Sequence, residues 1–197
     1  LALINSKIVL VGSISEMDGD IEEYIGGVYD FWVVCINDDG SILWQNTLGG
    51  TRVDEGYSIT TIDNNNLLIC GYTTSNDADV TEFYSIDPFM PDYWVINLDS
   101  LGTISWQISL GGNYSDFGEI GICDSIWNYF IGGYAGSDEF MVVENFGAYD
   151  FWLAKIKLCQ AIKFFYDEDF DGYGDVTKDS IACSIPLGYV IDSTDCN

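Results

Sequence analysis

An internal repeat of about 60 residues constrains this chain more than any other feature of its sequence. The segment Asp30–Val33, which reads Asp-Phe-Trp-Val, recurs in similar form at residues 92–95 and 150–153, with spacings of 62 and 58 residues. Such a period indicates one supersecondary unit copied along the chain. Four further features recur in the same order between these points: Trp44-Gln45 and Trp106-Gln107, Gly49-Gly50 and Gly111-Gly112, Asp54 and Asp116, Gly71-Tyr72 and Gly133-Tyr134.

Each repeat is predicted to consist of β-strands. Apolar and polar residues alternate in residues 42–48 and 104–110, which is typical of half-buried strands. Residues 31–36, 93–98 and 151–156 are almost continuously apolar, as expected of inner strands buried on both faces. Turn-forming clusters separate the strands at residues 38–40, 63–66 and 99–102.

Four short strands in about 60 residues predict one β-propeller blade with long outer loops. The fold class is therefore predicted to be all-β, with about three blades. The recurring Trp residues are expected to fill the space between neighbouring blades, and a sugar-stacking platform is the alternative. Propellers close with four or more blades, so the chain is expected to be a fragment, an open arc or part of a larger chain or assembly.

The composition narrows the classes of function. The chain has 32 acidic and 6 basic residues, a net charge of -26 and no histidine. Such a charge disfavours nucleic acid and anionic membrane surfaces as partners, because binding to phosphate depends on Lys and Arg. Without histidine, the chain cannot form a Ser-His-Asp triad, a Cys-His pair or a His-ligated zinc site. No apolar run approaches the roughly 18 residues of a membrane-spanning helix, so no membrane insertion is expected.

An acidic run near the C-terminus predicts a metal site. Asp167, Asp169 and Asp171 alternate along the chain, and Gly172 follows them at the point where the chain must turn sharply. This is the pattern of positions 1, 3, 5 and 6 of an EF-hand calcium loop. The alternative is an acidic, solvated turn, which carries the same charges without an ion.

The rest of this loop departs from an EF-hand. Tyr173 can offer its backbone carbonyl from position 7 and Asp175 its carboxylate from position 9, but position 12 is Lys178 instead of Glu. No helix-forming segment flanks the loop, so the sequence predicts a calcium site that is not an EF-hand. Without the bidentate Glu, its dissociation constant is expected to be on the order of 10⁻⁴ M. Asp179 and Asp195 are further candidate oxygen donors.

Two parts of the chain resemble known families. The repeat, with its Asp-aromatic-Trp, Trp-Gln, Gly-Gly and Gly-Tyr elements, resembles the long-blade β-propeller repeats of secreted and surface proteins from Bacteroidetes. Residues 165–197 resemble a metal-binding repeat related to thrombospondin type 3 calcium repeats. The resemblance implies an extracellular or cell-surface location, reached in such proteins often through type IX secretion.

The six cysteines fall into two groups. The second resemblance implies a disulfide between Cys183 and Cys196, which would close a short loop and indicate an oxidising compartment. Cys35, Cys70 and Cys123 lie in strand runs and are expected to act as small buried hydrophobic residues. The state of the sixth, Cys159, stays open.

These features predict two domains: residues 1–160 with the propeller-like repeats and residues 161–197 with the calcium-binding module. The expected function is a non-catalytic, calcium-stabilised binding or adhesion module that recognises a protein or glycan surface. A structural spacer within an exported protein is one alternative. A carbohydrate-active enzyme that uses paired carboxylates is the other. Its candidate acids repeat between units or lie in turns, so no catalytic pair is predicted: Asp54, Asp77, Asp79 and Asp116.

Overall fold

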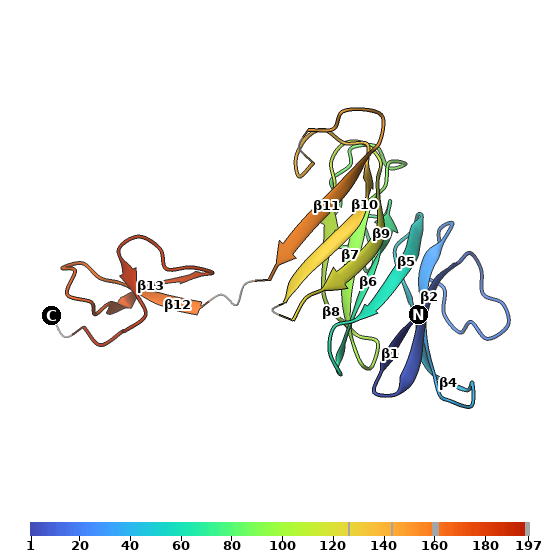
Figure 1. Ribbon diagram of the computed structural model, residues 1–197, viewed down its shortest axis with the longest axis horizontal. Helices are drawn as coiled ribbons and strands as arrows, with labels where there is room; N and C mark the ends of the chain where they lie inside the picture. Colours follow the sequence, from blue (N-terminus) through green and yellow to red (C-terminus); the bar gives the residue numbers. More distant parts are fainter. Residues whose placement is uncertain (126, 143, 159–161, 196–197) are drawn as a thin grey trace. The chain divides into compact units, whose positions relative to one another are not determined.

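The protein is all-β in the computed structural model, which describes residues 1–125, 127–142, 144–158 and 162–195 (Figure 1). These residues form fourteen strands in four antiparallel sheets, and none of their segments is a helix long and apolar enough to cross a membrane. The chain divides into two compact units, Leu1–Ile156 and Lys157–Asn197. The predicted domain boundary at residues 160–161 lies outside the described ranges.

Three sheets follow one another along the first unit, and in each of them strands that are neighbours in the sequence pair with each other. The first sheet consists of β1 (Ala2–Ile4), β2 (Lys7–Ile14), β3 (Asp30–Ile36) and β4 (Ile42–Leu48). The second consists of β5 (Asp54–Thr61), β6 (Asn66–Thr73), β7 (Asp92–Asp99) and β8 (Ile104–Leu110). The third consists of β9 (Asp116–Cys123), β10 (Asn128–Ala135) and β11 (Asp150–Lys157).

The second sheet has apolar residues on both faces because side chains alternate along its strands. In β6, Leu67 and Ile69 belong to the core shared with the first sheet, whereas Leu68 and Cys70 belong to the core shared with the third. In β7, Trp94 enters the first core and Tyr93 the second. Residues 93–98 are buried throughout, which confirms the prediction for this strand.

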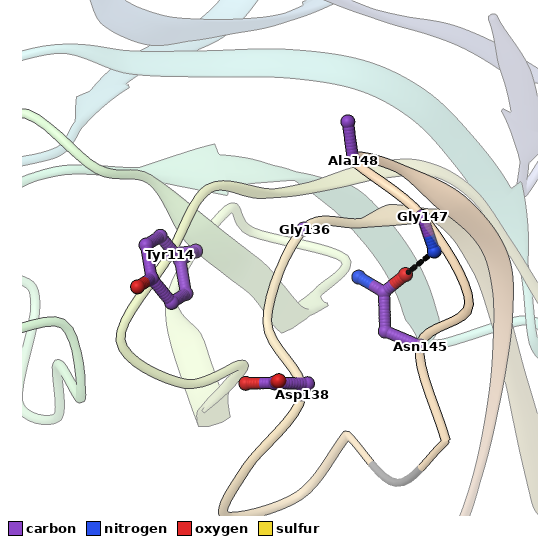
Figure 2. A pocket seen from close by; sticks show the side chains of 6 residues that line it. All are labelled: Tyr114, Gly136, Asp138, Asn145, Gly147 and Ala148. Carbon is purple, nitrogen blue, oxygen red and sulfur yellow. Dashed lines mark hydrogen bonds between the residues drawn. The ribbon is translucent and has the colours of Figure 1, made fainter.

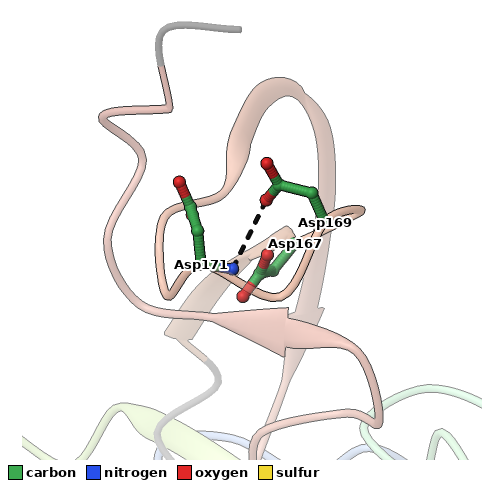
Figure 3. Close-up of side chains that lie close together, drawn as sticks. All are labelled: Asp167, Asp169 and Asp171. Atoms are coloured by element: carbon green, nitrogen blue, oxygen red, sulfur yellow. Dashed lines mark hydrogen bonds between the residues drawn. The ribbon is translucent and has the colours of Figure 1, made fainter.

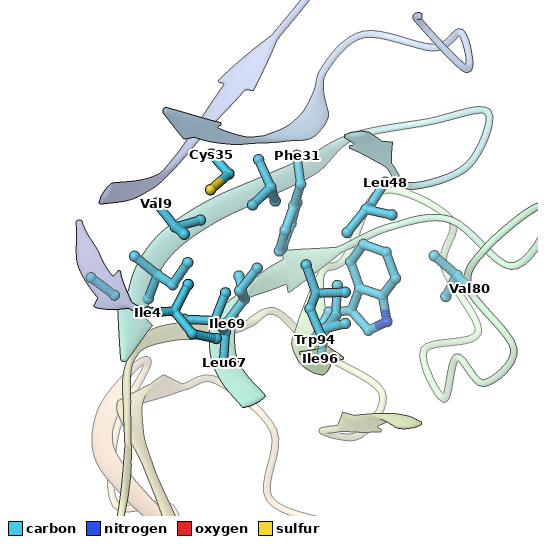
Figure 4. Close-up of a cluster of buried hydrophobic side chains, with 14 residues drawn as sticks. Ile4, Val9, Phe31, Cys35, Leu48, Leu67, Ile69, Val80, Trp94 and Ile96 are labelled. Carbon is cyan, nitrogen blue, oxygen red and sulfur yellow. The ribbon is translucent and has the colours of Figure 1, made fainter. Parts of the chain in front are cut away.

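Trp94 fills the space between the first and second sheets, together with Val9, Phe31 and Ile96 (Figure 4). Its ring is fully buried and meets the ring of Phe31 edge-on, with 4.8 Å between the ring centroids. Because no part of this ring is accessible, Trp94 does not offer a surface for stacking a sugar.

The recurring Trp-Gln pattern has a structural explanation. The indole nitrogen of Trp94 donates a hydrogen bond of 2.9 Å to Gln107, and that of Trp32 donates one of the same length to Gln45. The Gln therefore accepts from the Trp of the preceding strand in its own sheet, and not from the Trp beside it in the sequence.

The third sheet differs from the other two in its burial. Residues alternate between exposed and half-buried along β11, with Phe151 77% and Leu153 57% exposed. The prediction that residues 151–156 are buried on both faces was therefore wrong. Phe151 and Leu153 occupy the repeat positions of Tyr93 and Val95, which the third sheet covers, but among the described residues of the first unit no further sheet follows the third.

Cys35 and Cys70 are buried free thiols, as predicted, and Cys123 is a half-buried free thiol at the end of β9. Burial raises the pKa of the Cys70 thiol to about 12. Cys159 and Cys196 lie outside the described residues, so the disulfide between Cys183 and Cys196 stays a prediction.

The second unit is a small sheet of β12 (Ile162–Tyr166), β13 (Asp175–Ala182) and β14 (Tyr189–Val190), in the order β13-β12-β14. Phe164 of β12 is buried, and the rings of Tyr166 and Tyr189 meet edge-on with 5.3 Å between centroids. A register shift after Phe165 places Tyr166 opposite Asp175. This pairing brings together the two ends of the acidic loop.

Candidate metal centre

The acidic loop connects β12 to β13, so the small sheet fixes both of its ends. Asp167 is the first residue after β12, and its backbone N–H donates to the carbonyl of Gly188 at 2.9 Å. Gly172 turns the chain with a φ of 95°, a left-handed conformation that glycine adopts without strain. The strand pairing and this glycine direct the loop back on itself.

Three carboxylates converge inside this loop. Asp167, Asp169 and Asp171 each offer one oxygen, and these oxygens all lie within 4.8 Å of one another (Figure 3). Asp169 and Asp171 are exposed, whereas Asp167 is only 5% exposed. Three of the five predicted ligands therefore meet at one place.

The burial of Asp167 is the strongest sign of a ligand. One of its carboxylate oxygens, Oδ2, accepts a hydrogen bond of 3.0 Å from the backbone N–H of Gly172. The other, Oδ1, is buried and has no hydrogen-bond partner among the described residues. A buried acceptor without a partner is costly, more so when it is charged. A cation between the three carboxylates would supply the missing partner.

Backbone hydrogen bonds hold the other two carboxylates in place. The N–H of Asp171 donates to Oδ1 of Asp169 at 3.3 Å, and the N–H of Tyr173 donates to Oδ1 of Asp171 at 2.9 Å. These local bonds orient the two carboxylates. The role of the Tyr173 carbonyl as a ligand stays a prediction.

Asp175 is not part of the three-carboxylate cluster. Its Oδ1 accepts from the hydroxyl of Thr177 at 2.7 Å and from the N–H of the same residue at 2.8 Å. These hydrogen bonds lower the pKa of Asp175. Its Oδ2 lies 3.7 Å from the ammonium of Lys178.

Lys178, which stands at position 12 of the loop, makes an ion pair that sequence reasoning missed. Its Nζ lies 2.6 Å from Oε2 of Glu168. Both residues line a depression of about 540 Å³ together with Asp169, Asp175 and Asp195. Asp195 is therefore close to the loop, and its role as an oxygen donor stays a prediction. Asp179 instead pairs with Lys163 at 2.8 Å.

A second depression, of about 310 Å³, lies over the long loop between β10 and β11 (Figure 2). Asn145 is one of its lining residues, and the amide of Asn145 is hydrogen-bonded within the loop: Oδ1 accepts from the N–H of Gly147 at 2.9 Å and Nδ2 donates to two backbone carbonyls. Asp138 is the titratable carboxylate among the lining residues. A single acid beside a committed amide does not make a catalytic pair.

The acids considered for catalysis hold loops in place. Asp77 accepts two hydrogen bonds from Thr51, at 2.7 Å from its hydroxyl and 2.8 Å from its N–H, and these lower the pKa of Asp77. Asp54 and Asp116 are fully buried and accept from Ser75 and Ser137, respectively.

No protein-family model matches this chain, and none of the curated proteins shows a significant match. The interpretation of the acidic loop therefore depends on its geometry and on the chemistry of its oxygen donors.

Proposed function

We propose that the chain is a calcium-stabilised, non-catalytic binding module of a secreted or cell-surface protein, and that its acidic loop holds the ion. The buried and unpartnered Oδ1 of Asp167, within 4.8 Å of oxygens from Asp169 and Asp171, is the observation that supports this most. Calcium takes six to eight oxygen ligands in flexible geometry. Three carboxylates, the carbonyl of Tyr173 and water provide such a shell.

An ion in the loop would contribute to folding as well as bind. The second unit has few buried apolar side chains, and its carboxylates repel one another when no cation is present. The whole chain carries a net charge of -26, so a bound divalent cation also lowers the repulsion within the folded state. Metal binding and folding of this unit are therefore expected to be coupled.

In this proposal the first unit is a set of β-propeller-type blades. Two four-stranded antiparallel sheets and a three-stranded one, related by the sequence repeat, support that assignment. The exposed apolar residues of the third sheet, with Phe151 and Leu153 among them, support contact with a protein partner or with more of the same assembly. The partner is a protein or glycan surface, and export follows from the resemblance of the repeat alone.

Calcium titration followed by NMR on the full chain tests the loop site. The amide of Gly172, which donates to Asp167, reports on the loop itself. We expect its signal to shift with a dissociation constant on the order of 10⁻⁴ M. Asp169→Asn and Asp171→Asn should each weaken binding by about tenfold or more because each removes a charged ligand.

Asp39→Asn is the matched control, since Asp39 is an exposed turn carboxylate of the first unit whose Oδ1 also accepts from a residue two positions later. This variant should bind calcium in the loop as the native chain does. An unchanged Gly172 signal at millimolar calcium, or equal affinity in the native chain and both loop variants, would leave only an acidic turn.

Replacing Lys178 by Glu is expected to tighten binding in the loop. The change removes an ammonium that pairs with Glu168 and Asp175, and it adds a carboxylate at position 12. We expect about a tenfold lower dissociation constant for calcium, because affinity in such loops rises with the number of charged ligands. Lys163→Glu changes the net charge equally but lies in a pair with Asp179, so it should alter the affinity far less. Equal effects of the two substitutions would show that only the overall charge matters.

A further inference from the structure

Two buried carboxylates meet wherever the chain passes from one sheet of the first unit to the next, a place called here a junction. The first junction contains Asp30, the first residue of β3, and Asp54, the first residue of β5. The second contains Asp92 and Asp116, which begin β7 and β9. All four side chains are 0% exposed.

The backbone holds the two partners of each junction side by side. The N–H of Asp54 donates to the carbonyl of Tyr29, the residue before Asp30, at 2.8 Å. In the same way, the N–H of Asp116 donates to the carbonyl of Pro91, the residue before Asp92, at 2.6 Å. The proximity of the carboxylates is therefore built into the contact between the sheets.

A glycine lets the backbone approach both carboxylates of a junction closely. A methyl group on Gly49 would lie 2.6 Å from Oδ1 of Asp30 and 2.7 Å from Oδ2 of Asp54. A methyl group on Gly111 would meet Oδ1 of Asp92 and Oδ2 of Asp116 in the same manner. These glycines belong to the recurring Gly-Gly pairs, so the repeat preserves this close approach along with the acids.

One acid of each junction is satisfied and the other is not. Asp54 accepts hydrogen bonds from the hydroxyls of Thr73 and Ser75 and from the N–H of Gly50. The Oδ2 atoms of Asp30 and Asp92 accept from the backbone of the loops before them. Their Oδ1 atoms, which lie beside Gly49 and Gly111, are buried and have no hydrogen-bond partner among the described residues.

Two adjacent buried carboxylates need a compensating charge. Burial, with a smaller contribution from the neighbouring carboxylates Asp54 and Asp116, raises the pKa of Asp30 and that of Asp92 to about 7. In the described part of the chain, every Lys–carboxylate ion pair lies in the second unit. No basic side chain of the described residues forms an ion pair with a junction carboxylate.

We propose that each junction binds one divalent cation of the calcium class between its two carboxylates. The donors are oxygen atoms alone, which suits a hard cation, and backbone carbonyls and water would complete the shell. Such an ion links the third strand of one sheet to the first strand of the next. This site is independent of the acidic loop of the second unit.

The first junction should bind more tightly than the second. A third carboxylate, Asp79, lies near the first junction, where its Oδ2 accepts from the N–H of Gly49 at 3.2 Å. Met141 occupies the corresponding repeat position at the second junction. The negative charge of Asp79 near the ion would favour binding, so Asp79→Asn should weaken the first site and leave the second unchanged.

Metal stoichiometry tests the proposal directly. The full chain with Asp169→Asn and Asp171→Asn, which disables the acidic loop, is dialysed against millimolar calcium, and bound metal is measured by elemental analysis. We expect two ions per folded chain. Adding Asp30→Asn or Asp92→Asn should leave one ion.

Asp150→Asn is the matched control, because Asp150 has the same repeat position as Asp30 and Asp92. Its Oδ2 likewise accepts a hydrogen bond from the loop before it, but no second Asp of the described residues faces it. This variant should keep both ions. If the folded chain that carries only the two loop substitutions, Asp169→Asn and Asp171→Asn, bound no calcium, the proposal would be overturned. In the competing explanation, the two carboxylates of a junction share a proton instead of binding an ion. It predicts that Asp30→Asn alters neither the number of bound ions nor the response of the melting temperature to calcium.

Discussion

Replacing Trp94 by Ala is expected to lower the free energy of unfolding by about 3–5 kcal/mol. The side chain is fully buried between the first and second sheets and packs edge-on against Phe31. Its removal takes a large apolar surface out of the core and leaves a cavity that two hydrogen-bonded sheets cannot readily close. The substitution also leaves Oε1 of Gln107 without its indole donor.

Trp32 offers a control at the same position of the repeat. It donates the same 2.9 Å hydrogen bond to its own Gln, but it is only half-buried. Trp32→Ala should therefore cost about 1–2 kcal/mol, and the difference between the two variants isolates packing between sheets. Denaturant unfolding at one fixed calcium concentration measures both. Equal losses would show that the contact between the first two sheets adds little to stability.

The strands and their repeat could be predicted from the sequence because both depend on local patterns. The almost continuously apolar run of residues 93–98 predicts a strand buried on both faces, and β7 is such a strand. Turn residues such as Gly40 and Gly102 mark the ends of strands through their own backbone conformation, with φ of 85° and 86°. Neither inference requires knowledge of distant neighbours.

The burial of the third sheet could not be predicted in this way. Phe151 and Leu153 have the composition of a doubly buried strand, yet whether a face is covered depends on a neighbouring sheet and not on the strand itself. Apolar content alone therefore does not establish burial, as the exposed residues of β11 show.

The same distinction between local patterns and contacts of distant residues applies to the candidate sites. Asp167, Asp169 and Asp171 lie close in sequence, so their convergence follows from the pattern and the turning glycine. The meeting of Asp30 with Asp54 joins two different sheets, and the repeat marks both positions without indicating that they face each other. The pair of Lys178 with Glu168 likewise joins the two sides of a loop and has no local signal.

A methyl group at Gly71 is expected to lower the free energy of unfolding by roughly 3 kcal/mol or more. Gly71 in β6 pairs with Gly56 next to a register shift, and this brings the carbonyl of Glu55 against the position of the missing Cβ. The ring of Phe31 lies only 2.7 Å from the same position. The backbone of Glu55 and the buried ring of Phe31 cannot move away without a large energetic cost. Gly71→Ala therefore forces apart either β5 and β6 or the first and second sheets.

Gly12 occupies the same place in the repeat and gives the contrasting result. Strand β1 pairs with β2 only up to Val9, so no atom lies within 4 Å of a Cβ at Gly12. Gly12→Ala should change the free energy of unfolding by less than about 1 kcal/mol, and it can stabilise the fold by restricting the unfolded chain. Guanidinium unfolding of both variants measures the difference. If Gly71→Ala were as stable as Gly12→Ala, the close approach of β5 to β6 at this glycine would not be a feature of the folded protein.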